Sequence, residues 1–117
     1  MRNPSYVAQA AVTAALLGYG AIANAGIAYG VGALSCGSFL EIRKNDKSPA
    51  RSVYVNWIAG YLTASSAALN FEALDGTDMD GALYWVENYC RKAPTDMFGL
   101  AVESFVVGRS QLFRARK

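Results

Sequence analysis

The fold of this chain is decided by two segments, Ser35-Cys36-Gly37-Ser38-Phe39-Leu40 and Tyr84-Trp85-Val86-Glu87-Asn88-Tyr89-Cys90-Arg91-Lys92, which hold its only cysteines. Each segment has the pattern of a helix. In an oxidising compartment a single intramolecular disulfide, Cys36–Cys90, is the one pairing available. It would close a loop of more than fifty residues, which the chain-entropy model values at about 4 kcal/mol. The prediction therefore depends on whether these thiols meet an oxidising compartment.

The first twenty-five residues have the pattern of a secretory signal peptide. Arg2 precedes an apolar run that includes residues 10–22, and Ala23-Asn24-Ala25 provides a small-x-small cleavage site. We predict cleavage after Ala25 and a periplasmic location for the mature chain. Export would oxidise the two thiols and leave no stable membrane span after cleavage.

Two alternatives to a cleaved signal peptide remain. Residues 3–40 carry no charged side chain, so the run is long enough for an uncleaved membrane anchor. Its many glycines argue against that alternative. The other alternative is a lipoprotein acylated at Cys36, which lies late in the chain and whose acylation would leave Cys90 unpaired.

The composition argues against several classes of function. The formal net charge of +2 is too balanced to predict a nucleic-acid surface. The chain has no histidine, which removes the commonest general base and metal ligand. With the thiols expected in a disulfide and no nucleophile motif present, we predict a protein that is not an enzyme and holds no metal or cofactor.

Helical periodicity predicts four helices and no strand. The first runs from a Ser35 N-cap to about Asn45, the second covers residues 50–70, and Thr77 and Thr95 are predicted to cap the third and fourth. Glycine-rich residues 26–34 are expected to form a flexible lead. The predicted fold is therefore an all-α, small four-helix bundle over residues 35–117, in which the disulfide joins helices one and three.

The second helix is expected to be central and buried on more than one face, because Arg51 is its only charged residue. Gly60 in its middle predicts a close helix contact that offsets the glycine's cost. Tyr54, Trp57 and Tyr61 recur at helical spacing and are the candidate binding surface, although aromatic side chains in so small a domain favour the core.

Two further patterns concern the later helices. Asp78, Asp80, Gly81 and Glu87 match four positions of a calcium loop, but Gly76 stands where the loop needs an acid, so helix capping is the favoured interpretation. In the fourth helix, the spacing predicts an inner face of Met97, Leu100, Ala101, Ser104, Phe105, Gly108 and Leu112. Val102, Val106 and Phe113 are expected to extend this apolar surface.

The cysteine segments resemble the HdeA/HdeB family of small periplasmic proteins. The first match is Leu34-Ser35-Cys36-Gly37-Ser38-Phe39-Leu40-Glu41, and the second is Thr77-Asp78 followed by Val86-Glu87-Asn88-Tyr89-Cys90-Arg91-Lys92-Ala93-Pro94. The resemblance spans most of residues 34–107 and is specific near the cysteines. It implies an acid-stress chaperone, in which a folded homodimer separates in acid and offers apolar surface to unfolding client proteins.

The composition is compatible with such a response to acid. At about pH 2 nearly all nine acids would be neutral, and the mature chain would carry a charge of about +10 to +11. Self-repulsion would loosen the fold while the disulfide limits its opening.

The middle of the chain is similar to a different class. Gly60-Tyr61-Leu62, then Tyr89, Pro94 and an alanine- and valine-rich last helix resemble immunity proteins against type VI secreted amidases, of the Rap/Tai type. That resemblance implies a protein that binds and blocks a toxin. A structural envelope role is a third hypothesis.

Overall fold

The computed structural model describes residues 28–45 and 47–117, and over that range it is built from helices. A 3₁₀ helix precedes four α-helices in the order η1 (Gly30–Ala33), α2 (Cys36–Arg43), α3 (Ala50–Leu69), α4 (Met79–Lys92) and α5 (Phe98–Ala115). The Cys36–Cys90 disulfide joins α2 to α4, the first and third of these α-helices. The predicted all-α fold with this disulfide is thus confirmed. The predicted signal peptide lies outside the described residues.

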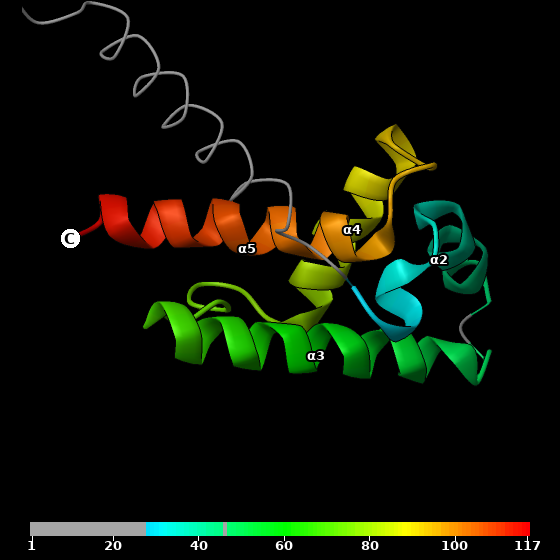
Figure 1. Cartoon of the computed structure of the whole chain (residues 1–117), viewed down its shortest axis with the longest axis horizontal. Coiled ribbons are helices and arrows are strands. Elements are labelled where there is room, and N and C mark those ends of the chain that lie inside the picture. Colours follow the sequence, from blue (N-terminus) through cyan, green and yellow to red (C-terminus); the bar gives the residue numbers. More distant parts are fainter. Residues whose placement is uncertain (1–27, 46) are drawn as a thin grey trace, which may run out of the picture.

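The helix at the centre of the fold is α5. Figure 1 shows α3 and α5 one above the other, both running from the end of the molecule where α2 lies, with α4 crossing beside them. Contacts join α5 to η1, α2, α3 and α4. Its buried residues include Phe98, Val102 and Phe105.

The second predicted helix, α3, is not the central one. It buries one stripe only, formed by Tyr54, Ile58 and Leu62. Val53 and Leu69 lie exposed on other sides of the helix. The prediction of burial on several faces was wrong because the uncharged faces of α3 consist largely of Ala, Ser and Thr, which tolerate water.

The start of α2 is fixed by its own cap and by the loop between α4 and α5. Ser35 Oγ accepts a hydrogen bond from the Ser38 backbone amide at 3.2 Å, as a helix N-cap does. The amides of Cys36 and Gly37 donate to the carbonyls of Asp96 and Pro94 at 2.8 and 2.9 Å. These bonds satisfy amides that have no acceptor within the helix, and they fasten the loop beside the disulfide.

The caps of α4 and α5 differ from the prediction. Asp78, not Thr77, is the N-cap of α4, and its Oδ1 accepts from the Gly81 amide at 2.8 Å. The N-cap of α5 is Met97, without a side-chain cap, rather than Thr95. The helix starts later because residues 94–97 are engaged by the start of α2.

The inner face of α5 is rotated from the predicted one. Met97, Leu100 and Leu112 are exposed, whereas Phe98 and Val102 are fully buried. Ala101 and Phe105 belong to the core as predicted. The two exposed residues at the start of the helix therefore face a surface groove instead of the core.

The described part of the glycine-rich lead packs against the fold instead of forming a flexible segment. Its η1 helix contacts α3 and α5. A Cβ on Gly32 would lie 2.2 Å from the Trp57 ring, so only glycine allows this approach. Gly30 has φ +62°, a conformation that favours glycine.

Candidate functional site

The structure separates the three aromatic residues of the predicted binding surface. Tyr54 is only 4% exposed, and its ring packs against Phe39 and Phe98 with centroids 5.4 and 4.9 Å away. Trp57 and Tyr61 are half-buried and stack on each other at 5.4 Å. Tyr54 thus belongs to the core, while the other two line a surface groove.

This groove lies between α3 and α5 and has a volume of about 720 Å³. The aromatic pair forms one wall, and residues at the start of α5 form the other. Within the described residues its lining consists of Ala28, Tyr29, Asn56, Trp57, Gly60, Tyr61, Met97, Gly99, Leu100 and Glu103. We refer to it below as the α3–α5 groove.

The indole of Trp57 is held rigidly in the groove wall. Its Nε1 donates a hydrogen bond to the Tyr29 carbonyl at 2.9 Å. The ring lies against Gly32 and packs near Phe98, 5.7 Å between centroids. A side chain fixed in this way loses little conformational entropy when a ligand binds.

Gly60 lies exposed on the groove surface of α3. No atom of the described chain, apart from the local backbone of its own helix, lies within 4 Å of the position that a Cβ would occupy there. The predicted close helix contact across Gly60 is therefore wrong. The groove lies where that contact was expected, and the cost of a glycine within a helix is not offset by packing inside the chain.

Glu103 is the charged residue of the groove lining in the described part of the chain. It is half-buried, and no hydrogen bond or ion pair joins it to another described residue. Burial raises the pKa of Tyr61, and the negative charge of Glu103 raises it further. Sequence reasoning missed Glu103, although its position three residues after Leu100 places both on one side of α5.

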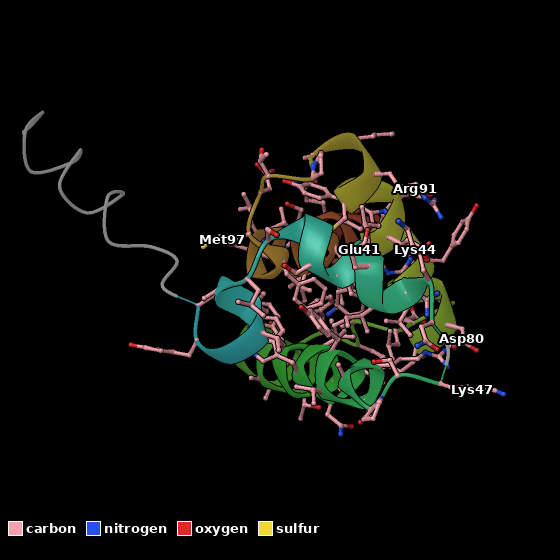
Figure 2. The ribbon with its side chains drawn as sticks, turned by 90° about the vertical axis from the view of Figure 1, so that its right-hand side faces the viewer. Glu41, Lys44, Lys47, Asp80, Arg91 and Met97 are labelled. Atoms are coloured by element: carbon pink, nitrogen blue, oxygen red, sulfur yellow. A yellow bond between two sulfur atoms is a disulfide. The ribbon has the colours of Figure 1, made fainter. Side chains whose placement is uncertain are left out.

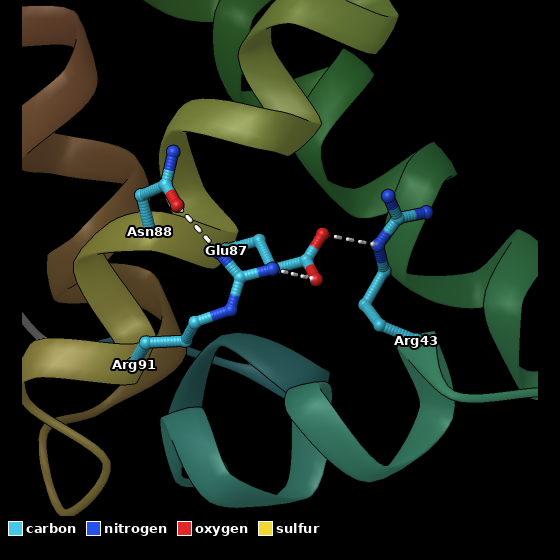
Figure 3. A network of polar contacts seen from close by, with 4 residues as sticks. All are labelled: Arg43, Glu87, Asn88 and Arg91. Atoms are coloured by element: carbon cyan, nitrogen blue, oxygen red, sulfur yellow. Dashed lines mark hydrogen bonds and ion pairs between the residues drawn. The ribbon is translucent and has the colours of Figure 1, made fainter.

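A carboxylate links α2 to α4 on another part of the surface (Figure 3). Glu87 Oε2 accepts from Arg43 Nε at 3.1 Å, and Glu87 Oε1 accepts from Arg91 at 2.6 Å. The Glu87 and Arg43 side chains are only 17% and 19% exposed. Arg91 also donates to Asn88. Figure 2 places Arg91 and Met97 on opposite sides of the molecule, so this cluster is remote from the groove edge.

Two further carboxylates hold the ends of α5. Asp96, just before the helix, accepts a hydrogen bond from the Tyr89 hydroxyl at 2.8 Å. This bond, together with burial, raises the pKa of Tyr89. At the other end, Asp75 pairs with Arg116 at 3.3 Å.

Residues 28–45 and 47–117 contain no group of three or more Asp, Glu or Cys side chains placed to hold a metal ion. Asp78, part of the near match to a calcium loop, caps α4 instead. No described helix combines the length and apolar character that crossing a membrane requires. Comparisons with protein-family models, with curated proteins and with solved structures give no match.

Proposed function

We propose that the chain is an exported, non-enzymatic chaperone of the HdeA/HdeB type, which offers apolar surface to unfolding client proteins in acid. The observation that carries this proposal is the chemistry of its long-range polar contacts. Among the described residues, three side-chain contacts between positions more than four apart, two ion pairs and a hydrogen bond, have a carboxylate acceptor. The acceptors are Glu87, Asp96 and Asp75.

Acid would weaken these contacts together, because a carboxylate that gains a proton loses its negative charge, even though the neutral carboxyl group can still accept a hydrogen bond. Loss of the Glu87 charge would leave Arg43 and Arg91 facing each other without a counter-charge. The positive charge of the whole chain would rise at the same time and favour expansion. The disulfide does not titrate, so α2 and α4 would stay joined.

The helix released by this change is α5. Asp96 and Arg116 hold its two ends, and the disulfide does not bind it to any other helix. Arg109 also donates to the backbone carbonyls of Ala73 and Asp75, a contact that acid does not remove. Acid does not remove the backbone bonds between the start of α2 and residues 94–98 either, so α5 would separate only when charge repulsion overcomes them.

Light scattering of an acid-unfolded client enzyme at about pH 3 tests this proposal. We expect suppression of aggregation by a stoichiometric amount of the chain, together with a dimer-to-monomer change in size-exclusion chromatography between neutral pH and acid. No suppression at stoichiometric excess would reject the chaperone function.

A pair of variants tests the role of the carboxylates. Glu87→Gln imitates the protonated side chain and should shift the acid opening to higher pH. Glu41→Gln is the matched control, because Glu41 pairs with the nearby Lys44, the C-cap of the same helix, and both side chains are 71% exposed. If both variants open at the same pH, the contacts of Glu87 with Arg43 and Arg91 do not determine the pH of the acid opening.

A second candidate function is inhibition of a secreted amidase. The α3–α5 groove supports it, because this groove is present in the folded chain and has a rigid Trp57 in its wall. Trp and Tyr are enriched among residues that dominate binding energy. This function predicts tight binding to an amidase at neutral pH, and a gene for a secreted effector beside the gene for this chain would indicate which amidase to test.

A further inference from the structure

We propose that the α3–α5 groove binds, near neutral pH, a polypeptide segment that carries a Lys or Arg beside apolar side chains. The site belongs to the folded chain and requires no acid-driven opening. Its failure would therefore leave the chaperone proposal intact, and failure of the chaperone assay would leave the groove proposal intact.

The charge of the groove indicates a cation. Glu103 is half-buried and has no partner among the described residues. A carboxylate in a partly apolar setting gains from a cation that replaces lost water. The stacked rings of Trp57 and Tyr61 line the same groove, and aromatic faces attract Lys and Arg cations at distances up to about 6 Å.

The other lining residues indicate apolar side chains next to that cation. Met97 and Leu100 are 42% and 40% exposed at the groove, well above the values for core residues. Burial of such apolar surface stabilises a complex by roughly 25 cal/mol per Å² before the costs of association. A ligand that is only a cation would leave these two side chains in water.

A polypeptide fits the length and the surface of the groove better than a small amine. The lining residues on α3 extend from Asn56 to Tyr61. The length of helix between these two residues exceeds one helical turn of about 5.4 Å. Gly60 presents no side chain there, so a peptide backbone could approach closely. The Asn56 amide is exposed and lies on the same wall, where it can donate to or accept from a peptide group.

The test is selection from a random dodecapeptide library displayed on phage, against the full chain at about pH 7. We expect enriched peptides with Lys or Arg next to apolar residues. Synthetic peptides from this set would then be titrated against variants by fluorescence anisotropy. Glu103→Gln should weaken binding about tenfold, the loss expected when a charged acceptor is neutralised.

Gly60→Leu should abolish binding by filling the groove. Gly108→Leu is the matched control. Gly108 also lies within a helix, and no described atom beyond the local backbone of that helix lies within 4 Å of its Cβ position, but Gly108 does not line the groove. Circular dichroism and thermal unfolding would verify that both variants fold. We expect the control to bind like the unaltered chain.

Three results would overturn the proposal. The first is selection of peptides without Lys or Arg. The second is binding that Gly60→Leu and Glu103→Gln leave unchanged. The third is competition by choline or N-acetyl-lysine amide at the affinity of the peptide, which would identify the groove as a site for a small organic cation instead.

Discussion

Reduction of the Cys36–Cys90 disulfide should remove a large part of the stability of the fold. The two cysteines are 54 positions apart, and the chain-entropy model then gives about 4 kcal/mol of stabilisation. A small domain has a total free energy of unfolding of about 5 to 15 kcal/mol. At about 4 to 8 °C per kcal/mol for a domain of this size, the reduced chain should melt roughly 16 to 32 °C lower.

Urea unfolding at neutral pH, with and without a phosphine reductant, measures this difference. The reduced natural chain is the primary sample because it retains both buried sulfur atoms. The Cys36→Ala/Cys90→Ala variant shows any additional cost of the cavities left by two fully buried side chains. A difference below about 1 kcal/mol between the oxidised and reduced chains would refute the reasoning from loop closure.

Three further predictions concern individual side chains. Gly60→Ala and Gly108→Ala should each stabilise the fold by about 1 kcal/mol in urea unfolding, because both positions are helical and open; a loss at Gly60 would reveal a packing contact there. Asp78→Ala should cost about 1 kcal/mol in the same assay by removing the N-cap of α4, and no change would show that solvent replaces this cap. The pKa of Tyr54 is raised by burial and that of Tyr89 by its hydrogen bond to Asp96 and by burial. Since the unfolded chain loses these phenolic protons first, stability should be constant up to about pH 10 and fall above it. Alkaline unfolding followed by phenolate absorbance tests this, and a stability that rises in that range would contradict it.

The parts of the fold that the sequence predicted are those set by local interactions. Helical spacing located all four α-helices, because side chains three and four positions apart meet on one face wherever the helix is placed. Ser35 was identified as an N-cap because its hydroxyl serves an amide three residues later. With only two cysteines, a single intramolecular pairing was possible whatever the fold.

The features missed from the sequence depend on contacts between distant segments. Gly32 suggested flexibility, but it is required by the indole of Trp57, twenty-five positions away. The inner face of α5 was misplaced because Phe98, Val102 and Val106 are also apolar, and only packing against the other helices selects which face is buried. Of the candidate site, sequence reasoning found Trp57 and Tyr61, but not Glu103 across from them, because no local pattern shows that α3 and α5 leave a groove between them.

The two proposed activities require opposite charge states of the same chain. Cation binding in the α3–α5 groove needs an ionised Glu103, whereas release of α5 needs protonated carboxylates at Asp96 and Asp75. The groove walls also come from α3 and α5, so separation of these helices would destroy the groove. A partner bound there near neutral pH would hold α5 in place and oppose acid opening by its binding free energy. A groove peptide should therefore shift the opening transition to lower pH, an effect that Gly60→Leu should cancel and Gly108→Leu should leave unchanged.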